Sequence, residues 1–233
     1  MLLNNIFVIL VNYLNKENKM EEKILVSTDS LNTKAKILLA AKQEFFEKGF
    51  SRANVRSIAE QAGLTTGALY NLFKNKDTLF DALVKNAFDN FMAVIQHDLS
   101  PAESDYNMKS SDLTTIMAVS RTRFLNMVNF FFENWDAMKL MICCSQGSSY
   151  EHIFDKAIEV VERETLRWLH YDGVEITRRI QFFIHVMVSS HFDNLSEIFY
   201  HDLTKQEAIE YVLDFNVYHC AGWKQYWMEQ VTG

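Results

Sequence analysis

Proline and glycine are scarce in this sequence, which holds one proline and seven glycines in 233 residues. Polar and apolar residues do not alternate between turn residues in the way that strands require, so a β-sheet is not expected. Long segments rich in Leu, Phe, Met, Glu and Lys run without interruption, and these residue types favour helices. The sequence therefore predicts an all-α protein that buries its core in one large or two modest domains.

Cysteine is equally rare. Of the three cysteines, Cys143 and Cys144 are adjacent, which gives neither a disulfide framework nor the spacing of a zinc site. We interpret all three as small buried side chains in a reducing cytoplasm. A phosphate-binding glycine loop, a nucleophile elbow and a paired-cysteine redox motif are also missing. We therefore expect no catalytic residues and no cofactor.

The histidines of the C-terminal part lack the arrangement of a helical metal site, which uses an i, i+4 pair or Glu-x-x-His spacing. They are His185, His191, His201 and His219. Scattered histidines of this kind are usually interface or surface groups, so we expect no bound metal.

Long hydrophobic runs are absent as well. The apolar segment Ile6–Val11 near the N-terminus is far shorter than the roughly 20 residues of a membrane span. Neither the basic start nor the small-residue cleavage site of a secretory signal accompanies it. We interpret residues 1–31 as an N-terminal extension, with Met20 as an alternative start, and expect a cytoplasmic protein without membrane contact.

Positive charge is concentrated in one part of the chain. The net charge is −7, yet residues 32–80 hold eight Lys and Arg against four Asp and Glu. Residues 1–31 sum to −1, so residues 81–233 carry −10. A basic module on an acidic body suggests that the module, and not the body, meets a polyanion.

The basic module has the pattern of consecutive helices. A first helix is predicted in TKAKILLAAKQEFFEKGF, residues 33–50, and Gly49 is expected to end it. A short second helix follows, with Asn54 as its cap and Gly63 in the turn behind it. The order of the helices and the tight glycine turn indicate a helix-turn-helix.

The third helix of the module is unusual because its outer face is almost without large apolar side chains. Thr65 is its predicted cap, and Leu69, Leu72 and Phe73 are expected to be buried. The outer face of residues 65–71 offers hydroxyls, an amide and a glycine, which suit phosphate oxygens and base edges in a major groove. An ordinary polar surface helix is the alternative.

Residues 49–80, GFSRANVRSIAEQAGLTTGALYNLFKNKDTLF, resemble the signature of the tetracycline-repressor (TetR/AcrR) family of bacterial regulators. The family pattern runs from a Gly-aromatic pair through Ile-Ala and Ala-Gly to Gly-x-Leu-Tyr-x-x-Phe and Lys-x-x-Leu. The resemblance, which covers residues 33–80, implies a DNA-binding domain at 32–80. It also implies a helical effector-binding and dimerisation domain at 81–233.

The resemblance assigns DNA contacts to the third helix, where the first residues would meet bases and backbone. Ala68 would meet at most a thymine methyl, while Tyr70 would bind a phosphate. The contacts implied on this helix are Thr65, Thr66, Gly67, Ala68, Tyr70 and Asn71.

Three further contacts are implied outside this helix. Lys76 would hold a phosphate at the start of the next helix, where the helix dipole also attracts anions. Arg56 would add a backbone contact from the second helix, beside its cap Asn54. The pair Ala53-Asn54 replaces the usual Thr-Thr, and Leu72 stands where the family often has His or an aromatic residue, so two phosphate contacts are expected to be missing.

The sequence of the acidic body, residues 81–233, predicts helices throughout. Residues 97–112 form a predicted loop, and apolar stretches follow near 113–132, 135–146, 151–170, 175–200 and 204–230. Residues 120–144 are rich in Phe and Met, which more often form core but also line adaptable cavities. The resemblance implies a pocket here for a small apolar or amphipathic effector. The candidate lining residues are Phe124, Met127, Phe131, Met138, Met141, Trp168 and Phe182.

The resemblance implies that the last two predicted helices pair across a two-fold axis in a homodimer. Their sequence allows this, because they carry more apolar surface than one partner covers. Two recognition helices about 34–36 Å apart would then meet successive major grooves of a palindromic double-stranded DNA operator. The function favoured by the sequence is a ligand-responsive transcriptional regulator, most simply a repressor released by a small molecule. The alternative is a helical interaction module whose basic N-terminal domain docks on an acidic protein partner.

Overall fold

The computed structural model describes residues 33–99 and 113–232, and every regular element in these two ranges is an α-helix. The all-α prediction is confirmed for this part of the chain. The predicted N-terminal extension lies outside the described residues, as does most of the predicted loop 97–112. The first three residues of that predicted loop, 97–99, are helical, so the loop prediction is wrong for them. Among the described helices, none contains an apolar stretch of the length that a membrane span requires.

The chain divides into two compact units. Among the described residues, the smaller unit comprises 33–44 and 54–79, and the larger comprises 45–53, 80–99 and 113–232. The bounds predicted from the motif, 32–80 and 81–233, differ from this division because residues 45–53 pack with the larger unit.

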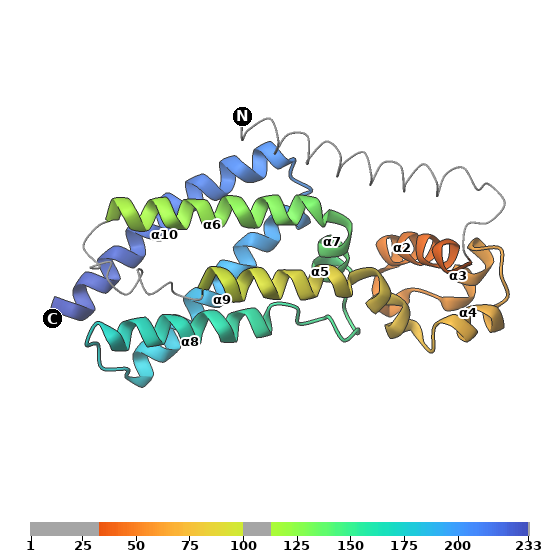
Figure 1. Ribbon diagram of the computed structural model, residues 1–233, viewed down its shortest axis with the longest axis horizontal. Coiled ribbons are helices and arrows are strands. Elements are labelled where there is room, and N and C mark those ends of the chain that lie inside the picture. The colour runs from red at the N-terminus through yellow and green to blue at the C-terminus, as the bar shows by residue number, and fades with distance from the viewer. Residues whose placement is uncertain (1–32, 100–112, 233) are drawn as a thin grey trace, which may run out of the picture. The chain divides into compact units, whose positions relative to one another are not determined.

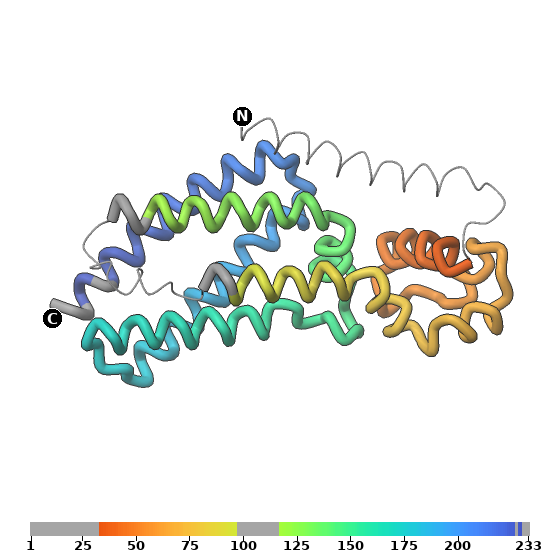
Figure 2. The backbone as a smooth tube through the Cα atoms, in the orientation of Figure 1, coloured from red at the N-terminus to blue at the C-terminus, as the bar shows by residue number. Residues whose placement is uncertain are grey.

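The smaller unit contains most of α2 (Thr33–Arg52), α3 (Val55–Gln61), α4 (Thr66–Leu72) and the first turn of α5 (Lys76–Leu99). The two short helices α3 and α4 follow each other across a tight turn (Figure 2). The helical backbone of α2 is interrupted at Gly49, which has φ 70° and ψ 161°, and a short turn follows to Arg52. The predicted break at this glycine is therefore present.

The larger unit contains the rest of α5 and five further helices. These are α6 (Leu113–Glu133), α7 (Trp135–Cys143), α8 (Asp155–Tyr171), α9 (Arg178–Tyr200) and α10 (Lys205–Thr232). Helices α6 and α10 pack side by side, as do α8 and α9 (Figure 1). The core between the helices is rich in aromatic and methionine side chains, including Phe91, Phe131, Met138, Met141 and Phe199.

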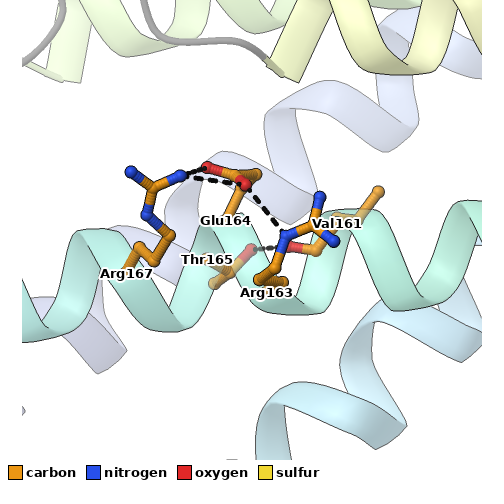
Figure 3. A network of polar contacts seen from close by, with 5 residues as sticks. All are labelled: Val161, Arg163, Glu164, Thr165 and Arg167. Carbon is orange, nitrogen blue, oxygen red and sulfur yellow. Dashed lines mark hydrogen bonds and ion pairs between the residues drawn. The ribbon is translucent and has the colours of Figure 1, made fainter.

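A buried carboxylate interrupts the inner face of α8. Glu164 accepts hydrogen bonds from Arg167 Nη1 at 2.9 and 3.2 Å and from Arg163 Nε at 3.2 Å. The two arginines reach Glu164 from either side along the helix, and both remain largely exposed (Figure 3). The charge of Glu164 is therefore compensated, as a buried carboxylate requires.

The loop between α7 and α8 forms hydrogen bonds with two other segments of the larger unit, the end of α2 and the first part of α5. The Cys144 carbonyl accepts a hydrogen bond of 2.7 Å from Phe50 N, and the Gln146 carbonyl accepts one from Ser51 Oγ. At the far end of the loop, Tyr150 Oη donates to Asp81 Oδ1 at 2.5 Å. The loop thus connects α7 to the end of α2 and to the beginning of α5.

Replacing Gly147 with alanine is expected to destabilise this loop. Gly147 has φ +86°, and an added Cβ would stand 2.7 Å from Ser51 Oγ. Gly173 is a matched control, since it also has φ +86° but nothing within 4 Å of an added Cβ. Both alanine variants carry the backbone strain, of about 1 kcal/mol or more, and only Gly147→Ala adds the clash. Thermal unfolding of the two variants measures the difference. Equal losses, or no recovery when Ser51→Ala is added to Gly147→Ala, would contradict this account of the loop.

Candidate nucleic-acid interface

The turn between α3 and α4 is built by local rules that the sequence makes visible. Asn54 caps α3, with its Oδ1 accepting from Arg56 N at 2.9 Å. Gly63 has φ 70°, a conformation that glycine adopts at low cost after a helix. Thr65 caps α4, with its Oγ1 accepting from Ala68 N at 3.2 Å. The predictions of both caps and of the glycine turn are confirmed.

Helix α4 is fixed to the smaller unit by one side only. Leu69 is fully buried, and Phe73, one turn later, is nearly so. The prediction that Leu72 is also buried is wrong, because 50% of its surface is exposed. Leu72 is the last residue of this short helix, and half of its surface is left uncovered there.

The opposite side of α4 is open. Tyr70 is 48% exposed, Gly67 and Asn71 are also exposed, and Thr66 is partly so. A Cβ added at Gly67 would meet only Thr65 Oγ1, at 3.9 Å. The face therefore combines polar groups with a stretch of bare backbone that a ligand surface can approach closely.

The start of α5 is fixed by a reciprocal cap that was not predicted from the sequence. Asn75 Oδ1 accepts from Thr78 N at 2.8 Å, and Thr78 Oγ1 accepts from Asn75 N at 3.1 Å. This pair resembles a capping box, with Thr in place of Glu or Gln. It holds Lys76, the first residue of the helix, at the positive end of the helix dipole. The spacing Asn-x-x-Thr was a readable signal.

Glu44 is a second residue whose role was not predicted from the sequence. Its carboxylate is fully buried and accepts three hydrogen bonds of 3.0 Å, from Asn54 N, Ser57 Oγ and Gln61 Nε2. These bonds fix the N-terminal end and one side of α3 against α2. Glu44 therefore positions α3, and with it the turn that leads into α4.

Arg56 lies at the start of α3 and is engaged with a neighbour. Its Nε donates to Glu60 Oε1 at 2.9 Å, and both side chains are highly exposed. An exposed pair of this kind is worth only a few tenths of a kcal/mol. Arg56 can exchange this partner for a phosphate at little cost.

The nine residues predicted to contact DNA all lie in the smaller unit. Asn54 caps α3 and Arg56 is the second residue of that helix. Six residues lie on or directly before α4, and Lys76 begins α5. Among the described residues, no group of three or more His, Cys, Asp or Glu side chains is arranged to hold a metal ion. The exposed groups of this interface are hydroxyls, amides and basic side chains, the groups that contact nucleic acid.

The predicted effector residues are distributed over four helices of the larger unit. Phe124, Met127 and Phe131 of α6 and Met138 and Met141 of α7 are buried, and Trp168 of α8 is partly exposed. Phe182 is 68% exposed, so it lies on the surface of α9 and does not line the interior with the others.

Polar groups in the interior were not predicted at all. His191 of α9 and His219 of α10 lie beside Phe124, with ring centroids 5.1 and 6.2 Å from it. Phe215, His219 and Trp223 recur every four residues along α10 and so share one stripe. That spacing indicates that the three side chains lie on one face of α10, but it does not show which other helix this face contacts.

The comparisons with known proteins follow the same division of the chain. Residues 37–83 match the family model of bacterial regulatory proteins of the tetR family. The transcriptional regulator TtgR of Pseudomonas putida is 41% identical over 56 residues, 24% of this chain and 27% of TtgR. The transcriptional repressor Rv1474c of Mycobacterium tuberculosis is 34% identical over 74 residues, 31% of this chain and 40% of the repressor. The matches thus cover less than half of either relative.

Solved structures extend the likeness to the larger unit, as a likeness of fold. A transcriptional regulator from Aquifex aeolicus VF5 superposes with a TM-score of 0.51 at 14% identity, over 78% of this chain and 96% of that one. The fold is an N-terminal helix-turn-helix domain followed by a larger helical domain. Residues 37–83 are therefore similar to the corresponding part of tetR-family regulatory proteins, and the fold of the chain resembles that of the Aquifex aeolicus regulator.

Proposed function

We propose that this protein is a homodimeric transcriptional regulator that binds a palindromic DNA operator through α4 and leaves it when a small molecule binds the larger unit. The observation that carries the proposal is the exposed face of α4, where Thr66, Gly67, Tyr70 and Asn71 have no protein core to fill. Hydroxyl and amide groups on such a face match base edges and phosphates in a major groove.

The surface of α9 and α10 supports a dimer. Phe182 and Val186 are exposed one turn apart on α9, and Val217 and Tyr218 are exposed on α10. Large apolar residues in this number on two neighbouring helices are typical of an interaction surface. Pairing them across a two-fold axis presents two copies of α4, and operators for such dimers have half-sites about 34–36 Å apart.

The loop between α7 and α8 supports coupling between ligand and DNA. Its contacts with Phe50, Ser51 and Asp81 connect α7 to the end of α2 and the beginning of α5. A ligand that shifts α6 or α7 would move both segments, and both continue along the chain into the DNA-binding unit. Coupling of this kind typically amounts to about 1–3 kcal/mol.

Substitutions on the interface separate two kinds of contact. Tyr70→Phe and Lys76→Ala are expected to weaken binding to all duplexes alike, because both side chains would contact phosphates. Lys76→Ala should also make the fall of log K with log salt less steep. The magnitude of the slope should drop by about 2 for a dimer, one for each lost phosphate contact. Thr66→Ala is expected to change the sequence preference instead, since its hydroxyl would read a base edge.

Gel-shift titrations on a set of duplex sequences measure these effects. Lys85→Ala is a matched control, because Lys85 is an exposed lysine on the same helix as Lys76 and forms an ordinary i, i+4 pair with Asp89. Uniform loss of affinity in Thr66→Ala would contradict its assignment. An equal loss in Lys85→Ala would show that general charge, and not the position of Lys76, is responsible.

A further inference from the structure

Four rings from three helices of the larger unit meet in its interior, and we call them the imidazole cluster: Phe124, His191, Phe215 and His219. The two imidazole centroids lie 5.0 Å apart. Phe124 lies 5.1 Å from His191, and Phe215 lies 5.4 Å from His219 and 5.6 Å from His191. Phe124 is buried, whereas the other three rings keep part of their surface accessible.

One hydrogen bond defines the protonation of the cluster. Trp223 Nε1 donates to His219 Nε2 at 2.7 Å, so Nε2 carries no proton. A neutral His219 therefore has its proton on Nδ1, which leaves one N–H donor pointing elsewhere. Among the described residues, no acceptor for this donor is present.

His191 is still less satisfied. Its contacts with the part of the chain that the structure describes are ring contacts only, without a hydrogen bond to either nitrogen. A neutral imidazole has one donor and one acceptor nitrogen. Both rings keep part of their surface accessible, so a bound molecule can reach the unused nitrogens of His191 and His219.

The cluster is uncharged at neutral pH. Burial, together with the neighbouring His219, lowers the pKa of His191 to about 3, and burial lowers the pKa of His219 to about 4. Neutral imidazoles surrounded by aromatic rings offer no full charge to an ion, and a carboxylate or ammonium group would be desolvated here without a partner. The site therefore favours a ligand that is aromatic and uncharged.

A hydroxyl group matches the unused nitrogens best. Its oxygen can accept from His219 Nδ1–H while its proton is donated to the acceptor nitrogen of His191. A carbonyl or an ether can only accept, so it would leave the His191 acceptor unused. We infer that the imidazole cluster binds an uncharged aromatic compound that carries a hydroxyl group. The further statement that this compound is the effector rests on the proposed function, because binding changes DNA affinity only if the protein is the proposed regulator.

Calorimetric titration of the full chain with 2-naphthol, in the absence of DNA, tests the inference. 2-Methoxynaphthalene keeps the ring and the oxygen but cannot donate, and 2-naphthoate carries a charge. Each is expected to bind the wild-type protein about tenfold more weakly, which corresponds to one lost hydrogen bond. Equal affinity for 2-naphthol and 2-methoxynaphthalene, tighter binding of 2-naphthoate, or no binding of 2-naphthol would overturn the inference.

A pair of variants locates the site. His191→Phe keeps a ring in the cluster and removes the acceptor, so 2-naphthol should bind about tenfold more weakly. His185→Phe is the control, since His185 lies on the same helix but is exposed and contacts Glu162. Equal affinity in the two variants would place the ligand elsewhere. The wild-type comparison of three ligands still decides the chemical class if His191→Phe does not fold. Binding of 2-naphthol without any effect on DNA affinity would leave the ligand class standing and contradict only the proposed release.

Discussion

Replacement of Glu44 with alanine is expected to lower the free energy of unfolding of the smaller unit by about 3 kcal/mol. The buried carboxylate accepts from Asn54 N, Ser57 Oγ and Gln61 Nε2, each at 3.0 Å. Hydrogen bonds to a charged acceptor are worth more than neutral ones, and the truncation leaves three donors without their partner. Because two of these donors lie on α3 and the third is the backbone N–H of its cap, α3 should loosen first.

Hydrogen exchange of the amides of residues 54–62 in the full chain measures this loss locally. Glu60→Ala is the matched control. It removes a carboxylate from α3 itself, and the pair of Glu60 with Arg56 is exposed. That pair is worth about 0.3–0.5 kcal/mol. If the exchange of α3 in Glu44→Ala is no faster than in Glu60→Ala, the buried carboxylate does not hold the unit together.

The second large effect is a loss of stability in acid caused by the imidazole cluster. The pKa values of His191 and His219 fall from the ordinary 6.5 to about 3 and about 4 in the folded protein. Between pH 6.5 and 4 the unfolded chain therefore binds protons that the folded protein does not, and the free energy of unfolding rises with pH. Each histidine contributes about 1.4 kcal/mol per pH unit inside its window. The stability is complete above pH 6.5 and is lost as the pH falls toward 4.

Urea unfolding between pH 7 and pH 4.5 measures this slope. His191→Phe removes the histidine with the larger pKa shift and keeps a ring in contact with Phe124, so its curve should be flatter by about 1.4 kcal/mol per pH unit. Adding His219→Gln, which keeps an acceptor for Trp223 Nε1, should flatten it further. A slope in His191→Phe as steep as in the wild type would contradict the neutral state assigned to His191.

Local rules of chain conformation predicted much of the smaller unit. Asn54, Gly63 and Thr65 each act within a few residues of their own position, so their roles follow from sequence neighbours alone. The bounds of the predicted helices in the larger unit also lie close to the observed ones, because long apolar periodic segments are a strong signal. Leu72 was predicted wrongly because the end of a short helix leaves its flank without a covering element.

The parts that the sequence did not predict depend on contacts between distant residues. Glu44 occupies an apolar stripe of α2, and its burial is explained only by donors that lie 10 to 17 residues later. His191 and His219 meet because α9 and α10 face each other across Phe124, a pairing that no local pattern specifies. Phe182 was assigned to the interior by its residue type, whereas its position on α9 turns it outward.

The central claim is that the open face of α4 seats against duplex DNA, and Gly67→Ala tests it most directly. The free protein has room for the added methyl group, whose nearest neighbour would be Thr65 Oγ1 at 3.9 Å, and alanine favours a helix over glycine by about 0.5–1 kcal/mol. Folding should therefore be unchanged or improved, while the methyl group holds the backbone away from the DNA.

The measurement is the affinity of wild-type and Gly67→Ala protein for a duplex selected by the wild type from a random pool, between 50 and 200 mM salt. We predict that wild-type affinity falls about a thousandfold over this range, as phosphate contacts require, and that Gly67→Ala binds at least about tenfold more weakly at every salt concentration. A wild-type affinity independent of salt, or a Gly67→Ala protein that binds as tightly as the wild type, would contradict the account.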